Sequence, residues 1–454
     1  MHWWASCCGA RPIDTSAARQ LPVSAPSRPA FGCGWLVAIA GLALVVRLAA
    51  IAYSGDFQPP FEQEWESIAR TIVQHGFFGM ELNNDYGSNT LKVTSFIPPL
   101  YPLLLAGLAK LFGGQGWLAI RLLQAVLSTL SVLLGCDLAW LLWRQVPVTR
   151  LAGLMAAVFP PLVASVAESN PVTIEVLLLL LFIRLSLPAR LVPGAPAWRW
   201  VAAGAVLGLA ALNRAPILSL LPWIVVVLWV NRLTGVSLWS AVVGPVLVVG
   251  ALAAIVISPW AVRNYVALHA FVPISTNGGI NFWIGNNPRA TGEYISPPEV
   301  APGLLRASDA LGEPQRDIFF YTQGILFIRE DPRQFVRLLG LKLYYFIWER
   351  PDVGKTYGDH PGVGLGRLAY LLGTVALLPL WVLGALLTAR DWRRLLVVHG
   401  PILVTLAQNL AYFVATRFRT PAAPFQILLA AYALALAIEA GTPWLRRECA
   451  LWVS

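Results

Sequence analysis

Ten long apolar runs dominate this chain and restrict it to a fold built inside a lipid bilayer. They lie at about residues 33–53, 117–143, 151–167, 171–187, 200–214, 215–231, 237–259, 364–388, 395–413 and 422–440. A helix needs about 20 apolar residues to cross a bilayer, where no water satisfies the backbone polar groups. With 57% apolar and only 12% charged residues, the chain is expected to be an all-α, polytopic membrane bundle of about 10–12 helices.

The two ends of the chain are predicted to lie outside this bundle. Residues 1–32 mix arginines with scattered Pro and Ser, which is typical of a disordered cytoplasmic leader. The run at 33–53 is followed by no small-residue cleavage site, so we expect a retained signal anchor. A membrane domain at 33–440 and a cytoplasmic tail at 441–454 complete the predicted organisation.

Arginine-rich loops predict the orientation. They include Arg144 and Arg150, Arg190 with its neighbours, and Arg232, and positive charge keeps short loops in the cytoplasm. All of these loops can lie inside only if the shorter runs at 97–112 and 336–348 do not cross the membrane. Each of the two is therefore expected to be an interfacial helix or a half-helix. Ten crossings follow, in the inner (plasma) membrane, with outer loops at 54–116 and 259–335. The net charge of +10 is explained by these loops and implies no nucleic-acid partner.

The first outer loop is rich in acids. Its carboxylates are Asp56, Glu62, Glu64, Glu66, Glu81 and Asp85. A carboxylate beside a bilayer can act as the general base on an acceptor hydroxyl or amine. Glu64 is the best-placed candidate, because it opens a short helical pattern whose apolar side would lie on the membrane. Glu62 and Asp56 are its rivals, and ordinary solvation of an exposed loop is the alternative.

Charged residues also lie at the outer ends of the apolar runs. Arg47, Arg121 and Arg214 share one depth. Glu168 lies just before a fourth apolar run, and Glu175 lies about one turn inside it. A charge inside the membrane costs about 2.5–3.5 kcal/mol on an insertion scale, so such residues often mark functional sites. Cations at headgroup depth suit a lipid phosphate, although an arginine at a helix end can also simply snorkel to water.

Several stretches resemble one family. They are 64–70 (EWESIAR), 75–77 (HGF), 96–103 (FIPPLYPL), 110–113 (KLFG), 258–265 (SPWAVRNY), 273–279 (PISTNGG), 285–288 (GNNP), 342–346 (KLYYF) and 417–421 (RFRTP). In this order they look like the outer segments of GT-C type membrane glycosyltransferases. That group includes the protein mannosyltransferases, the aminoarabinose transferase of lipid A and related transferases that decorate lipopolysaccharide. The resemblance covers about residues 33–440.

The resemblance implies a many-helix fold with two interfacial helices in the first outer loop. It also implies inverting transfer of a sugar from a polyprenyl-phosphate donor on the outer (periplasmic) face. The family's first-loop acid falls on Glu64, although Trp65 follows it where the commoner pattern is an Asp before a Tyr. The second acidic position falls near Asn170 and would be filled by Glu168 or Glu175.

Binding roles follow from the same resemblance. The lipid-phosphate candidates are Arg121, Arg214 and Arg263, with Lys92 as a loop candidate. The substrate-binding candidates in the matching stretches are Tyr101, Asn264, Asn277, Gly278 and Arg417. The outer stretch 259–335 is expected to form a flexible lid over the site.

The expected partners are a polyprenyl-phosphate sugar, an acceptor that is a lipid, glycan or protein, and membrane lipids. No cofactor is predicted, because the sugar–phosphate bond is already activated. No metal is predicted either, since the five cysteines lack metal-ligand spacing and no tight acid–histidine cluster occurs; a divalent cation could still serve as the electrophile, as in some relatives.

Two other classes remain as alternatives. A lipid-linked glycan flippase or transporter would place charged or broken helices near the bilayer midplane, with repeat symmetry between its halves. An O-antigen polymerase or ligase would use large outer loops late in the chain. The acid-rich first loop favours the glycosyltransferase.

Overall fold

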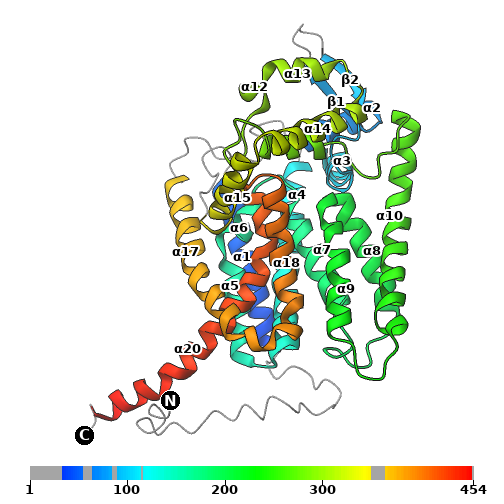
Figure 1. Cartoon of the computed structure of the whole chain (residues 1–454). Coiled ribbons are helices and arrows are strands. Elements are labelled where there is room, and N and C mark those ends of the chain that lie inside the picture. Colours follow the sequence, from blue (N-terminus) through cyan, green and yellow to red (C-terminus); the bar gives the residue numbers. More distant parts are fainter. Residues whose placement is uncertain (1–32, 55–63, 84–88, 114–115, 349–362, 452–454) are drawn as a thin grey trace.

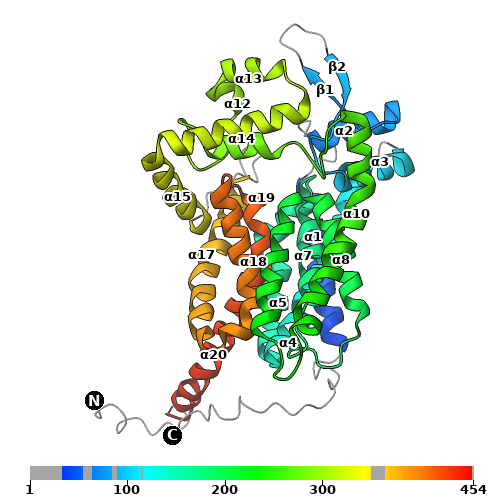
Figure 2. The same ribbon diagram turned by 45° about the vertical axis from the view of Figure 1, so that its right-hand side comes forward.

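The computed structural model describes residues 33–54, 64–83, 89–113, 116–348 and 363–451. Helices run side by side in an upright bundle, and shorter elements gather at one end of it (Figures 1 and 2). Asp56, Glu62 and Asp85, together with the predicted leader, lie outside the described residues.

Eleven described helices form the bundle. They are α1 (Cys33–Ser54), α4 (Gly116–Trp143), α5 (Val146–Val158), α6 (Pro160–Ala167), α7 (Val172–Leu185), α8 (Trp198–Asn213), α9 (Leu220–Val230), α10 (Gly244–Leu268), α17 (Val363–Leu387), α18 (Trp392–Ala411) and α20 (Ala423–Leu451). Every predicted apolar run coincides with one helix or with a bent pair. Among the described residues five helices are long and apolar enough to cross a membrane, or six with the pair α5–α6, which bends by 41°. The chain is a multi-pass membrane protein.

The outer layer contains the remaining elements. They are α2 (Glu64–His75), β1 (Gly79–Asn83), β2 (Asn89–Val93), α3 (Leu100–Phe112), α11 (Gly278–Gly285), α12 (Pro297–Val300), α13 (Pro302–Asp309), α14 (Glu313–Glu330), α15 (Pro332–Ile347) and α19 (Thr416–Arg419). Strands β1 and β2 form an antiparallel hairpin that the sequence did not indicate. The start of α1 and the end of α20 lie at the opposite end of the bundle (Figure 1). The two interfacial helices of the first loop are therefore present as α2 and α3.

Helix α10 differs from its prediction. It continues through Pro259 as far as Leu268 and ends at His269, which has a left-handed φ of 51°. Pro259 lacks an N–H group, so the carbonyl of Ile255 loses its helical donor. The Ser258 hydroxyl donates to that carbonyl at 2.9 Å and lets the helix continue. The first ten residues of the predicted outer segment 259–335 are therefore helical and continue α10.

Small residues bring α8 and α10 together. A Cβ atom on Gly204 would lie 2.6 Å from the Cβ of Leu252, and one on Gly208 would lie 2.7 Å from the Cβ of Val256. Membrane helices lack a hydrophobic drive to associate, and a small-xxx-small pattern lets their backbones pack closely. The end of α8, which carries Arg214, is thereby held against α10.

Arg47 explains the break between α5 and α6. It is fully buried, and its guanidinium donates to the carbonyls of Ala157 at 2.9 Å and Ala156 at 3.4 Å. It also donates to the Ser128 hydroxyl at 2.7 Å. These carbonyls lose their helical partners where α5 ends before Pro160. Arg47 therefore caps a broken helix, rather than joining Arg121 and Arg214 in a phosphate site.

Candidate active site

Acids and arginines meet at the outer end of the bundle, where α2, the turn between α6 and α7, the end of α8 and α19 converge. We call Glu64, Glu168, Glu175, Arg214 and Arg417 the acid–arginine cluster. Arg417 interacts electrostatically with Glu64 and Glu168 and is repelled by Arg214. Residues separated by up to 353 positions (64 to 417) in the chain are thus brought to one place.

The pair of Arg214 and Glu175 anchors this cluster. Arg214 Nη1 lies 2.6 Å from Glu175 Oε2, with side-chain exposures of 17% and 9%. The same nitrogen donates to the backbone oxygen of Arg417 at 3.3 Å. The ring of Phe418 lies 4.5 Å from the Arg214 guanidinium and 5.2 Å from that of Arg417. Glu175 therefore positions Arg214, and Phe418 spaces the two cations.

Glu168 lies in the turn that ends α6 and begins α7. Its Oε2 atom accepts a hydrogen bond from Asn170 Nδ2 at 2.7 Å. Asn170 Oδ1 in turn accepts from the Val172 amide at 3.0 Å, which satisfies a free N–H group at the start of α7. Glu168 is half-buried and lies ahead of Pro171, as one of the two candidates, with Glu175, for the predicted second acidic position.

Helix α2 presents Glu64 on its exposed side. Trp65 is buried, and its Nε1 atom donates to the Ser169 carbonyl at 2.8 Å. Trp65 and Ala69 pack in one apolar cluster with Tyr101 and Leu105 of α3. The apolar side of α2 therefore lies on α3, not on the membrane as its sequence pattern suggests. Glu64 is exposed and remains open to an acceptor.

Tyr101 supports the turn that carries Glu168. It is 1% exposed, and its hydroxyl donates to Gln124 Oε1 at 2.8 Å. Gln124 Nε2 donates to the carbonyl of Glu168 at 2.9 Å. Arg121, one turn earlier on α4, is buried and interacts electrostatically with Tyr101. The structure thus places Tyr101 and Arg121 beneath the cluster.

A second network surrounds Glu313 at the start of α14. Its carboxylate accepts from the hydroxyls of Thr94 at 2.6 Å and Thr276 at 2.7 Å, and from the Ser95 amide at 2.8 Å. Arg263 donates to the carbonyls of Thr94 and Phe78, both at 2.7 Å. Arg263, a predicted phosphate ligand, therefore joins the first outer loop to α10 in this structure.

The other candidates of the later outer segment lie around α11. Asn264 is fully buried, and its Nδ2 atom donates to the Val272 carbonyl at 2.9 Å. Asn277 precedes α11. Gly278 leaves no space for a side chain, since a Cβ atom there would lie 2.2 Å from the Tyr321 hydroxyl. These residues shape the outer layer. Lys92 is exposed on β2, opposite Met80, apart from the acid–arginine cluster.

The sequence patterns did not point to three polar residues that make specific contacts in the structure. Gln124 carried a usable signal, because a polar amide inside an apolar helix is costly unless it is bonded. Glu313 is one of several acids in the outer segment, and no sequence pattern distinguishes it from the others. Arg419 lies two residues after Arg417 in the predicted motif, but only the structure shows that it faces Phe346, 5.5 Å away.

The structure does not test whether a metal takes part. Among the described residues no three His, Cys, Asp or Glu side chains group closely enough to hold an ion.

Comparisons with known proteins agree with this architecture. Residues 97–262 match the family profile of the dolichyl-phosphate-mannose-protein mannosyltransferases. No curated protein matches the chain.

Among solved structures the chain is similar to an oligosaccharyltransferase of Archaeoglobus fulgidus. One structure, a complex with Zn and sulfate, is 15% identical over 92% of this chain and 51% of that one, with a TM-score of 0.50. Another, tethered to an acceptor peptide, is 13% identical over 91% of this chain and 51% of that one, with a TM-score of 0.54. This chain thus spans about half the length of those structures.

ArnT from Cupriavidus metallidurans bound to undecaprenyl phosphate is 16% identical over 90% of this chain and 79% of that one, with a TM-score of 0.42. The match to the oligosaccharyltransferase, at a TM-score of 0.54, shows that the chain has the fold of the GT-C type membrane glycosyltransferases, and its residues 97–262 match the profile of the mannosyltransferase family.

Proposed function

We propose that this protein transfers a sugar from a polyprenyl-phosphate donor to an acceptor on the outer face of the plasma membrane, with inversion at the sugar. The acid–arginine cluster carries the proposal, because it combines an exposed carboxylate with two arginines at one end of a membrane bundle. The family description, which names a dolichyl-phosphate-mannose donor, supports it.

In this proposal Arg214 and Arg417 bind the donor phosphate. Guanidinium groups suit phosphate oxygens, and their charge stabilises the phosphate as the sugar leaves. Glu175 neutralises part of that charge and keeps Arg214 in place. The ring of Phe418 contacts both guanidinium groups and offsets part of their mutual repulsion.

Glu64 serves as the general base. Its carboxylate takes the proton of an acceptor hydroxyl, and the acceptor oxygen attacks the anomeric carbon from the side opposite the phosphate. The bond between that carbon and the phosphate oxygen breaks, and the polyprenyl phosphate leaves with both bonding electrons. A single displacement inverts the sugar. Glu168 holds the acceptor or shares the proton, and the step needs no nucleotide, redox cofactor or metal.

The test is transfer of labelled sugar from polyprenyl-phosphate donors to a membrane lipid and glycan extract by the purified protein. Glu64→Gln is expected to lower the rate by about 10²-fold or more, the usual contribution of a general base, while binding of the polyprenyl phosphate survives. Glu330→Gln, on the exposed end of α14, is the matched control. Dialysis against EDTA is expected to leave the rate unchanged.

Equal transfer by wild type and Glu64→Gln would move the base to Glu168, Glu62 or Asp56. If no donor supports transfer, while the protein moves lipid-linked glycans across vesicles, the flippase alternative would replace this proposal.

A further inference from the structure

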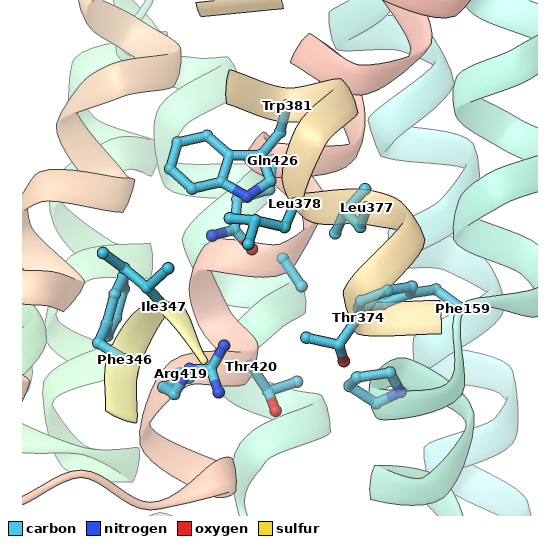
Figure 3. A pocket seen from close by; sticks show the side chains of 12 residues that line it. Phe159, Phe346, Ile347, Thr374, Leu377, Leu378, Trp381, Arg419, Thr420 and Gln426 are labelled. Carbon is cyan, nitrogen blue, oxygen red and sulfur yellow. The ribbon is translucent and has the colours of Figure 1, made fainter. Parts of the chain in front are cut away.

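A lateral groove lies between α15, α17 and α20, at the edge of the bundle. Its enclosed part is small, about 30 Å³, and the rest is open to the side. Phe346 of α15, Leu377 and Leu378 of α17, and Gln426 of α20 line it, with Arg419 at one end. Figure 3 shows the Arg419 guanidinium and the Gln426 amide facing the same space, with Trp381 at the far end.

The groove and the acid–arginine cluster share the short helix α19. Arg417 interacts with Glu64 and Glu168 of the cluster. Arg419, two residues later, lies over the ring of Phe346 and lines the groove. The short helix α19 thus places Arg417 at the acid–arginine cluster and Arg419 at the groove.

The groove is amphipathic along its length. Leu377, Leu378 and Trp381 form an apolar wall, while Arg419 and Gln426 form a polar one. The Thr374 hydroxyl, also in the lining, is buried and has no hydrogen-bond partner within the described part of the chain. A polar group without a partner is costly at membrane depth. The site therefore suits a ligand with both a hydrocarbon chain and a polar, anionic end.

We infer that this groove binds the acceptor, and that the acceptor is an anionic lipid that enters laterally between α15 and α17. The inference rests on the proposed function, in which Arg214 and Arg417 already hold the donor phosphate. A second anion then needs a cation of its own, and Arg419 supplies it. Leu372 and Val375 of α17 are exposed, so this helix presents an apolar surface to the bilayer beside the groove. A lipid bound here brings its polar end to Arg419 of α19, two residues after Arg417 of the cluster.

The test uses photo-crosslinking of a diazirine-bearing phosphatidic acid to the full chain in phosphatidylcholine nanodiscs, with the labelled peptides mapped by mass spectrometry. We expect labelling around Leu378 and Gln426, competed by unlabelled phosphatidic acid and not by phosphatidylcholine. Arg419→Gln is expected to reduce labelling about five-fold, and Arg419→Lys much less. Leu378→Trp is expected to block the groove, while Leu372→Trp, on the exposed side of α17, is the matched control. Thermal unfolding checks that each variant folds.

Steady-state kinetics distinguish binding of the acceptor lipid from binding of the donor lipid. Arg419→Gln is expected to raise the KM for a lipid acceptor and leave the KM for the donor unchanged, whereas Arg417→Gln should impair the donor. Competition of the labelling by polyprenyl phosphate, at concentrations that saturate donor binding, would assign the groove to the donor and overturn the inference. Unchanged labelling in both Arg419→Gln and Leu378→Trp would also overturn it. The labelling needs no turnover, so failure of the proposed function alone would appear as normal labelling without transfer.

Discussion

Arginines that look alike in the sequence have different partners in the structure. Arg47 donates to backbone carbonyls and to Ser128, Arg214 pairs with the carboxylate of Glu175, and Arg263 bridges carbonyls of the outer layer. Most hydrogen bonds of Arg47 and Arg263 go to backbone carbonyls and hold backbone segments together. Of these three, Arg214 alone lies in the acid–arginine cluster, so it alone suits a phosphate.

Replacement of Arg47 by Met is expected to destabilise the bundle. The change leaves the carbonyls of Ala156 and Ala157 without their donors at the break between α5 and α6. Hydrogen bonds inside membrane proteins average about 0.6 kcal/mol, so the loss of three long-range bonds should cost about 2 kcal/mol. Thermal unfolding in detergent measures it. Val45→Met, at an exposed position of the same helix, should change little, and an unchanged midpoint for Arg47→Met would refute the capping role.

At the scale of elements, the outer layer is tied together by acids at one end of α14. Glu313 joins β2 and the α3 segment to the stretch before α11. Asp317, one turn later, accepts a hydrogen bond from the Gly279 amide at 2.5 Å. The segment predicted as a lid is therefore folded into helices and bonded to the first outer loop. Whether it moves stays a prediction.

Asp317 makes the outer layer sensitive to pH. Burial, with the nearby charge of Glu313, raises the pKa of Asp317 to about 6. A carboxyl whose pKa is higher in the folded state binds more protons there, so its contribution to stability is largest at low pH and falls as the pH rises through 6. Tyr321 also interacts with it.

We therefore expect Asp317→Asn to raise the unfolding midpoint relative to wild type at pH 7.5, with that difference falling to about half at pH 5 and mostly lost near pH 4. The amide oxygen of Asn keeps an acceptor for Gly279. Asp309→Asn, exposed on α13, is the control. A difference between variant and wild type that does not vary with pH would contradict the assignment.

At the scale of the whole molecule, the arrangement of elements agrees with the predicted sidedness. The loop that joins α9 to α10, which contains Arg232, lies at the end of the bundle opposite α2, α3 and α14 (Figure 1). Positive charge in short loops favours the cytoplasm. The acid–arginine cluster and the groove would then both face outward.

Cysteine accessibility tests this sidedness. In a background without the five native cysteines, Ala307→Cys on α13 is expected to react with an impermeant maleimide in right-side-out vesicles. Ala189→Cys, in the loop after α7, should react only in inverted vesicles. Both positions are exposed, so burial cannot explain a missing signal. The opposite pattern would place the candidate site in the cytoplasm and exclude an outer-face reaction.

The sequence predicted the bundle well and the site in part. Glu64, Glu168, Glu175, Arg214 and Arg417 come together, because each lies at the outer end of its element. Asn264 on α10, Asn277 and Gly278 at the start of α11, and Lys92 on β2 lie elsewhere in the outer layer, since local patterns do not encode which elements pack together. The β-hairpin was missed for the same reason, and the break at Pro160 because the run at 151–167 is apolar throughout.

The sequence alone determined the membrane class, the helical runs and the expected orientation. These depend on the transfer of each segment from water to lipid, which follows from local composition. Only the tertiary structure decided which charges meet and which bind backbone. The partners of Arg47, Arg214 and Arg419 come from helices distant in the chain. Where water does not reach a guanidinium, its partners are the acceptors or rings that helix packing places beside it.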